Sequence, residues 1–182
     1  MALVGGALAH GVMTARAFFS FLLTSALVLA GFAIVWVWAA PYYGQLQIAV
    51  LRFLISPELR LALDPDGITV HHQQEGLLMR REFLSFGGVG LTLALWVATP
   101  RRRWRWRFGG LILSLALLFV AHLFVFLGLL EFAQSVAQGR ATGGQTLLYS
   151  FVAVSDWVVP VLVWGFLAFG FLRQPVDRDF TT

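Results

Sequence analysis

The sequence contains no cysteine and no lysine, and only 12% of its 182 residues are charged. Without cysteine there are no disulfides, thiolate metal sites, iron–sulfur clusters or cysteine nucleophiles. A soluble domain carries about 25% charged residues, so this chain has too little charge to cover itself in water. The sequence also has no Walker, Rossmann, nucleophile-elbow or zincin motif. It therefore gives no sign of catalysis, and we expect a protein that is not an enzyme.

Hydrophobic residues make up 59% of the chain, and the mean hydropathy is +0.79. They gather in four runs, at residues 18–39, 84–99, 108–130 and 147–172. A helix that crosses a bilayer needs about 20 apolar residues. The second run rises only about 24 Å, so its ends must snorkel or the bilayer must thin. We predict an all-α integral membrane protein whose four transmembrane helices form one membrane domain, residues 1–182.

Five arginines lie among the seven residues that join the second and third runs. A short loop with so many positive charges stays in the cytoplasm. With four spans, both termini are then cytoplasmic, and Arg16, Arg173 and Arg178 agree with this orientation. The use of arginine in place of lysine favours a bacterial source. The prediction is a multi-pass protein of a bacterial inner (cytoplasmic) membrane.

The same connector has the composition of a nucleic-acid-binding segment, because arginine pairs with phosphate and tryptophan stacks on bases. Its position between two predicted spans favours a topogenic role instead. Arginines interact with anionic lipid headgroups, and tryptophans lie at headgroup depth. We therefore predict membrane lipids, and no nucleic acid, as the partner of the connector residues Arg101, Arg102, Arg103, Trp104, Arg105, Trp106 and Arg107.

The longest polar segment, residues 41–83, is predicted to be an extracytoplasmic insertion with two parts. Residues 45–55 have helical spacing of apolar residues, typical of an amphipathic helix on the bilayer surface; its apolar positions are Leu46, Val50, Phe53 and Leu54. Residues 58–64 and 68–72 alternate around a Pro-Asp-Gly turn, which predicts a β-hairpin. A lone hairpin is marginally stable, so we expect it to dock on another surface.

Two ionisable residues fall inside predicted spans, His122 in the third and Asp156 in the fourth. Such residues are candidate functional sites, here for a proton or cation, and Pro160 should open the backbone beside Asp156. Structural roles are also open. His122 suits a hydrogen bond to a serine, a threonine or Asp156, and Asp156 suits a bond to Ser155 or His122 or a neutral state. Haem ligation by two histidines is not expected, because no other predicted span contains a histidine.

A metal site was considered at His71, His72 and Glu75. Adjacent residues of a strand point to opposite faces, and no further histidine or cysteine lies near enough in sequence to complete a tetrahedral site. We therefore predict neither a metal nor a cofactor.

The segment Phe83-Leu84-Ser85-Phe86-Gly87-Gly88 leads into Leu93-Ala94-Leu95-Trp96-Val97-Ala98-Thr99-Pro100 and then into the arginine connector. With a charge-free first run that ends in aromatic residues and an outer hairpin, this order resembles the exosortase H-associated membrane proteins. The resemblance implies an accessory role beside an exosortase, a bacterial membrane transpeptidase of proteins with C-terminal sorting signals. Exosortases use a cysteine, so this chain is not the transpeptidase.

The predicted function is that of a non-catalytic accessory protein which docks a membrane-protein partner, and the resemblance implies an exosortase-type transpeptidase as that partner. Two other functions stay open. One is a small proton- or cation-handling membrane subunit that uses Asp156 and His122. The other is a structural subunit of a pigment or respiratory membrane complex.

Overall fold

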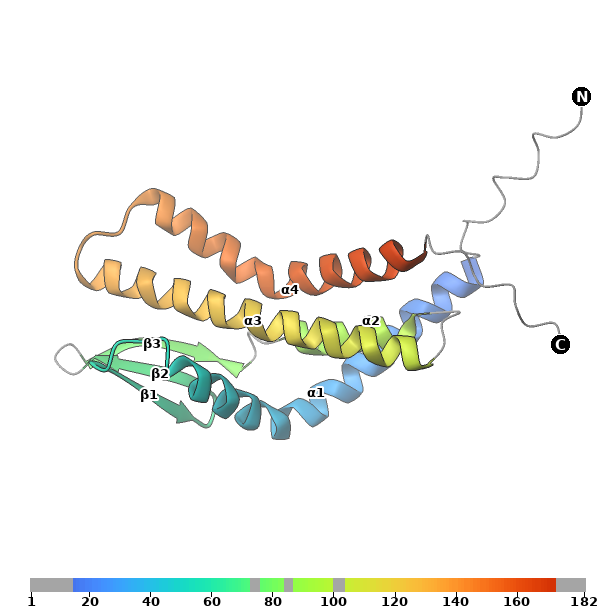
Figure 1. Cartoon of the computed structure of the whole chain (residues 1–182), viewed down its shortest axis with the longest axis horizontal. Helices are drawn as coiled ribbons and strands as arrows, with labels where there is room; N and C mark the ends of the chain where they lie inside the picture. Colours follow the sequence, from blue (N-terminus) through green and yellow to red (C-terminus); the bar gives the residue numbers. More distant parts are fainter. Residues whose placement is uncertain (1–14, 73–75, 84–86, 100–103, 173–182) are drawn as a thin grey trace, which may run out of the picture.

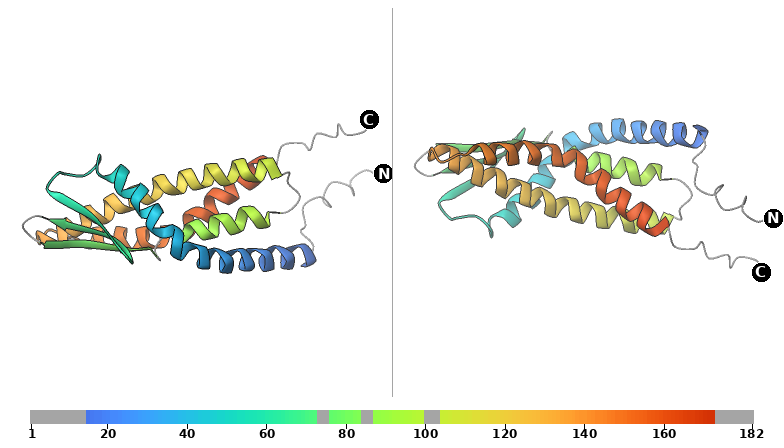
Figure 2. Two further views of the ribbon diagram at one scale, coloured as in Figure 1. Left: turned by 90° about the horizontal axis from the view of Figure 1, so that it is seen from below. Right: turned by 90° about the horizontal axis from the view of Figure 1, so that it is seen from above.

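The computed structural model describes residues 15–72, 76–83, 87–99 and 104–172. Its elements in chain order are α1 (Ala15–Leu51), β1 (Leu59–Asp64), β2 (Gly67–His72), β3 (Gly76–Glu82), α2 (Gly88–Ala98), α3 (Trp104–Ala137) and α4 (Gly143–Leu172). Figure 1 shows an elongated molecule with the three strands at one end and the start of α1 and the end of α4 at the other. α3 runs along nearly its whole length, and the two views of Figure 2 agree.

We name the two parts of the molecule by their residues. The helical end comprises residues 15–39, 88–98, 104–118 and 155–172. The sheet end comprises the three strands together with residues 40–51 of α1 and 119–137 of α3. α1 and α3 therefore contribute to both ends, as Figure 1 shows.

The prediction of an all-α protein with four transmembrane helices is wrong. Among the described residues, two helices are long and apolar enough to cross a membrane: α1 with 37 residues and α3 with 34. α2 has 11 residues and rises only about 16 Å, half the thickness of the hydrocarbon core. The corresponding apolar stretch of α4 is Trp157–Ala168, which is also short. Together with the three-stranded sheet, these helices make a mixed α and β fold.

The sequence itself sets the C-terminal end of α2. The residue before a proline is sterically pushed out of the helical region, and Thr99, which precedes Pro100, has ψ 117°. The helix therefore ends at Ala98. The span predicted at residues 84–99 ends at nearly the same place, so the remaining difference lies at its start, where α2 begins at Gly88 and residues 84–86 lie outside the described part of the structure.

α1 continues through Pro41 to Leu51, so the separate surface helix predicted at residues 45–55 is absent. Figure 1 shows α1 bending between its two halves, and proline is a common cause of such a bend. Of the predicted apolar positions, Leu46 is 55% exposed and Phe53, beyond the end of α1, is 89% exposed, so neither packs into the core. The buried face has helical spacing and consists of Ala40, Gly44, Gln47, Ile48 and Leu51.

The strands form one antiparallel sheet in the order β1-β2-β3. β1 and β2 pair from Leu59↔His72 to Asp64↔Gly67, which is the predicted hairpin. β3 adds a third strand that the sequence pattern did not indicate. Its register with β2 shifts between Val70 and His71, so the side chains of β3 do not keep a simple alternation. The central strand β2 is buried from Gly67 to Val70.

The core of the sheet end lies between the sheet and the two long helices. Ile68 and Val70 of β2 are fully buried and belong to one apolar cluster with Leu51 of α1 and Phe126 of α3. Full burial of each such side chain stabilises the fold by roughly 1.5–3 kcal/mol. The cluster therefore fixes the sheet against both helices.

α2 lies at the centre of the helical end, and glycines let large aromatic rings approach the backbone there. A side chain at Gly90 of α2 would collide with the ring of Phe32 from α1, and one at Gly110 of α3 would collide with Trp96 of α2. At Gly87 an added Cβ would lie 2.9 Å from Trp157 of α4. Small residues at helix contacts allow close packing of this kind.

The indole groups of the helical end donate hydrogen bonds to hydroxyls inside the bundle. Trp96 Nε1 donates to Ser114 Oγ at 2.8 Å, and Trp164 Nε1 donates to Thr99 Oγ1 at 2.9 Å. The Thr99 hydroxyl in turn donates to the Leu95 carbonyl at 2.6 Å. These two indole groups are thus paired with side chains from other parts of the bundle.

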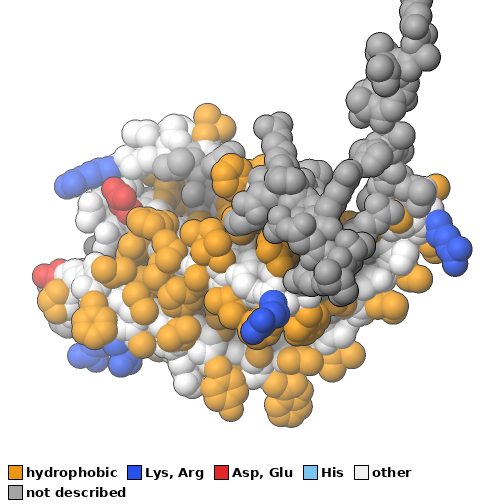
Figure 3. All heavy atoms as spheres, turned by 45° about the vertical axis from the view of Figure 1, so that its right-hand side comes forward, with side chains coloured by type: hydrophobic (Ala, Val, Ile, Leu, Met, Phe, Trp, Pro, Cys, Tyr) orange, Lys and Arg blue, Asp and Glu red, His pale blue; other side chains and the backbone are white. Residues whose placement is uncertain are grey.

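The outside of the helical end is apolar. In the most apolar 18-residue window of α1 no residue is buried, and in that of α3 only 28% are. Figure 3 shows hydrophobic side chains spread over the face turned to the viewer, with few charged ones among them. Exposed apolar surface on this scale is typical of a face that contacts a membrane or another protein.

Candidate functional site

A buried polar cluster joins α1, α3 and β3 at the sheet end. Tyr43 Oη lies 2.7 Å from Nδ1 of His122, and which of the two donates depends on the tautomer of the imidazole. Arg81 Nη1 donates to the backbone carbonyl of His122 at 3.2 Å. His122 is 1% exposed and Arg81 4% exposed. A buried cation of this kind is tolerated only when its donors are paired.

Aromatic rings enclose the Tyr43–His122 pair. The ring of Tyr43 meets Phe119 edge-on at 5.7 Å between centroids and lies 5.6 Å from Trp36. Trp36 Nε1 also donates to the Phe83 carbonyl at 3.2 Å, which ties α1 to the end of β3. The cluster is therefore held by packing as well as by hydrogen bonds.

Gln47 lies one helical turn beyond Tyr43 on the buried face of α1. Its side chain is fully buried, and neither of its amide atoms has a hydrogen-bond partner within the described part of the chain. A buried polar group without a partner costs about 1–3 kcal/mol. The unpaired amide of Gln47 therefore lowers the stability of the sheet end.

His122 was predicted from the sequence, but its partner was not. We expected a serine, a threonine or Asp156, and the structure pairs the ring with Tyr43, 79 residues away. The backbone of Asp156 lies within α4, and its side chain lies outside the described part of the structure. The role predicted for Asp156 therefore stays a prediction.

Sequence reasoning missed Tyr43, Gln47 and Arg81. Tyr43 and Gln47 are four residues apart, as are Gly44 and Ile48, so the two pairs lie on adjacent rows of one helix. A prediction of one continuous helix would have placed them on the same face. Arg81 lies in the predicted extracytoplasmic insertion, where no sequence pattern indicates that it is buried. Only the presence of β3 turns it inward, opposite Ile68 in the sheet register.

The arginine connector is partly helical. Arg101–Arg103 lie outside the described residues, whereas Trp104–Arg107 form the first turn of α3, four residues earlier than predicted. Arg107 Nη1 donates to the Val97 carbonyl of α2 at 3.2 Å. The ring of Trp106 lies 5.0 Å from that of Trp96. These contacts join the start of α3 to the end of α2.

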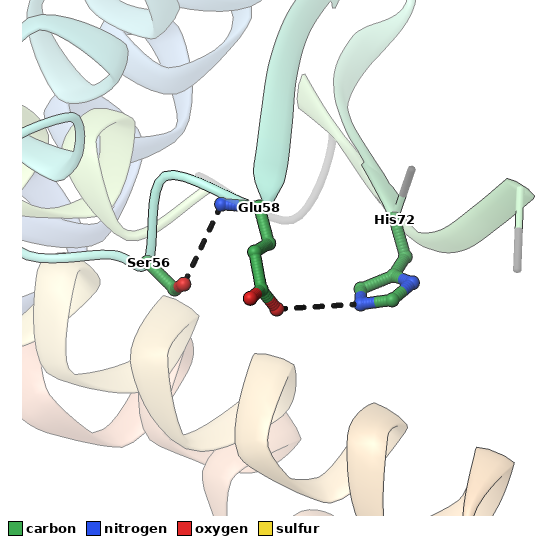
Figure 4. A network of polar contacts seen from close by, with 3 residues as sticks. All are labelled: Ser56, Glu58 and His72. Carbon is green, nitrogen blue, oxygen red and sulfur yellow. Dashed lines mark hydrogen bonds and ion pairs between the residues drawn. The ribbon is translucent and has the colours of Figure 1, made fainter. Parts of the chain in front are cut away.

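Two long polar contacts lie at Glu58, just before β1. Figure 4 shows Glu58 between Ser56 and His72, with its carboxylate 3.9 Å from His72 Nε2. The backbone N–H of Glu58 donates to Ser56 Oγ at 3.5 Å. Within the described residues no three histidine, aspartate or glutamate side chains are placed to hold a metal ion, and Glu75 lies outside them.

No protein-family model matches the chain, and comparisons with curated proteins and with solved structures find no match either. The function is therefore argued from the geometry of the chain itself.

Proposed function

We propose that the protein is a non-catalytic accessory protein of a bacterial inner membrane that docks a membrane-protein partner through its sheet end. Support for the membrane comes from α1 and α3, whose length and hydropathy suit a span. Support for the sidedness comes from Figure 1, in which the start of α3, with Arg105 and Arg107, lies at the opposite end from the sheet. Under the positive-inside rule the sheet would face away from the cytoplasm.

The observation that carries the proposal is an exposed apolar turn at the sheet end, directly after α1. Phe53 is 89% exposed and Leu54 56% exposed. They adjoin a cavity of about 470 Å³ lined by Arg52, Ile55, Ser56, Pro57, Leu59, Arg60 and Leu61. Aromatic side chains beside a pocket with arginines are enriched at protein–protein interfaces. This turn, residues 52–57, is the docking surface that we propose.

The partner that we propose is an exosortase-type transpeptidase. It rests on the resemblance of Phe83–Pro100 to the exosortase H-associated membrane proteins and on the layout of the chain around it. Two residues of that segment make contacts within the fold. The backbone carbonyl of Phe83 accepts a hydrogen bond from Trp36 Nε1, and the ring of Trp96 packs on Gly110. The contact with Gly110 accounts for Trp96 by packing, and co-purification tests the partner.

The test is co-purification of an exosortase with the full chain in mild detergent. Replacing Phe53 by serine should reduce the recovered partner about tenfold or more, as for an aromatic residue central to an interface. The matched control is Phe19→Ser, because Phe19 is 69% exposed on the apolar half of α1, far from the turn. Equal recovery with both variants, or no exosortase with the unaltered chain, would overturn the proposal.

The cation-handling alternative has less support. Arg81 places a positive charge 3.2 Å from the backbone oxygen of His122, and a nearby like charge disfavours a further cation. The accessory function predicts that Asp156→Asn leaves partner recovery unchanged. Loss of a proton or cation flux with the same variant would favour the alternative.

A further inference from the structure

Two adjoining cavities lie at the helical end, where α3 begins, and they meet at Gly109. The inner cavity has a volume of about 220 Å³ and is lined by Trp96, Trp106, Gly109, Gly110, Leu113 and Leu167. The outer cavity has a volume of about 390 Å³ and is lined by Trp104, Arg105, Phe108 and Gly109. We call the two together the Gly109 groove.

The groove exists because position 109 has no side chain. A Cβ built on Gly109 would meet no atom within 4 Å, whereas one built on the neighbouring Gly110 would collide with Trp96. The fold therefore fills the space at Gly110 with its own tryptophan and leaves the space at Gly109 open. A ligand could occupy that space without moving the helix.

The chemistry of the groove changes along its length. The inner cavity is lined by carbon-rich side chains, including Trp106, Leu113 and Leu167, whereas the outer cavity carries the exposed guanidinium of Arg105. None of the residues that line either cavity is acidic. A molecule that complements this surface has an apolar chain attached to an anionic group.

The start of α3 also carries positive charge that no acidic residue of its first turn offsets. A helix N-terminus carries about half a positive charge and favours acidic residues, but the first turn of α3 has none and contains Arg105 and Arg107 instead. Arg107 is directed to the Val97 carbonyl of α2. Arg105 remains at the outer cavity, where an anion would offset both its charge and the helix dipole.

We propose that the Gly109 groove binds one anionic phospholipid, with the phosphate at Arg105 and one acyl chain lying over Gly109 against Trp106 and Leu167. This inference rests on the proposed membrane location, because a bilayer supplies such a lipid. It goes beyond a general attraction of arginines to headgroups, since it names one site with one bound molecule.

The experiment is native mass spectrometry of the purified full chain in mild detergent, with phosphatidylglycerol or phosphatidylcholine added. We expect one bound phosphatidylglycerol, and binding of phosphatidylcholine weaker by about fivefold or more, the factor for one arginine near an anionic headgroup. Arg105→Gln should remove this preference. The control Arg16→Gln should keep it, because Arg16 is exposed at the start of α1 and does not line the groove.

The acyl-chain part is tested by Gly109→Leu, which should reduce binding of both lipids. Its control is Gly128→Leu on the same helix, where an added Cβ also meets nothing within 4 Å. Arg105 is exposed, so its variant tests the headgroup contact even if Gly109→Leu lowers stability.

Equal binding of the two lipids by the unaltered chain, equal loss with both glycine variants, or a dimer in place of the lipid adduct would overturn the site. Recovery of the protein in the soluble fraction of carbonate-washed cells would instead overturn the proposed membrane function.

Discussion

The helical end and the sheet end share α1 and α3, yet they are packed by different means. At the helical end, aromatic rings lie directly on glycines, as Phe32 does on Gly90 and Trp96 on Gly110. At the sheet end one ring also lies on a glycine, Phe83 on Gly44, but most of the packing is a buried apolar cluster of strands and two helices around Leu51 and Ile68. A half-buried tyrosine, a buried histidine and a buried arginine accompany that cluster.

The difference follows from the solvent proposed for each end. Lipid tails are as apolar as the helices, so apolar burial supplies little attraction between helices, and close backbone packing must hold them together. At an end that faces water, apolar burial provides the main stabilisation. A single helix such as α1 can therefore be exposed and apolar over one half and amphipathic over the other.

The largest effect that we expect is at the sheet end. Leu51→Ala should lower the free energy of unfolding by about 2–5 kcal/mol, because it leaves a cavity in the core. Leu51 is fully buried, whereas Leu46, on the same helix, is 55% exposed. The control Leu46→Ala should change the free energy by no more than about 0.5 kcal/mol in denaturant unfolding in detergent. Similar losses for both variants would contradict the buried face assigned to α1.

The next effect probes the helical end. Gly110→Ala should destabilise by about 1–3 kcal/mol, because its methyl group collides with Trp96. Gly128 lies on the same helix, and a Cβ there meets no neighbouring atom. Gly128→Ala should therefore stabilise slightly, by about 0.5–1 kcal/mol from helix propensity. The melting temperatures of the two variants should shift in opposite directions. Shifts of the same sign would contradict the close packing of Trp96 on Gly110.

A smaller effect isolates the polar cluster from the apolar core around it. Tyr43→Phe keeps the ring but removes the hydroxyl that lies 2.7 Å from His122, with an expected loss of about 0.5–1.5 kcal/mol. The control is Tyr42→Phe, because Tyr42 is exposed. Equal melting temperatures for the two variants would show that packing alone holds α1 against α3.

The smallest effect concerns the surface of the sheet. Arg80 Nη2 lies 3.0 Å from Asp66 Oδ2, and both side chains are substantially exposed. Asp66→Asn should therefore cost no more than about 1 kcal/mol, and the cost should shrink at high salt. A double-mutant cycle with Arg80→Gln measures the coupling. A coupling that does not change with salt would contradict the assignment of this pair to the exposed surface.

The candidate site was only partly readable from the sequence. His122 stands out as an ionisable residue in an apolar run, whatever it contacts. Tyr43 and Arg81 do not, because the sequence contains no signal for contacts that span 79 and 41 residues. Gln47 falls outside the apolar positions of the surface helix predicted at residues 45–55, and only the continuity of α1 through Pro41 places it on the buried face.

By itself the sequence determined the features that depend on local composition and period. These are the low charge, the apolar stretches within α1 and α3, and the hairpin of β1 and β2 around the Pro65-Asp66-Gly67 turn. Tertiary structure alone decided the continuity of α1, the addition of β3, the central position of α2 and the inward position of Arg81. Each of these depends on which distant surfaces meet, and a side chain's neighbours along the chain do not specify that.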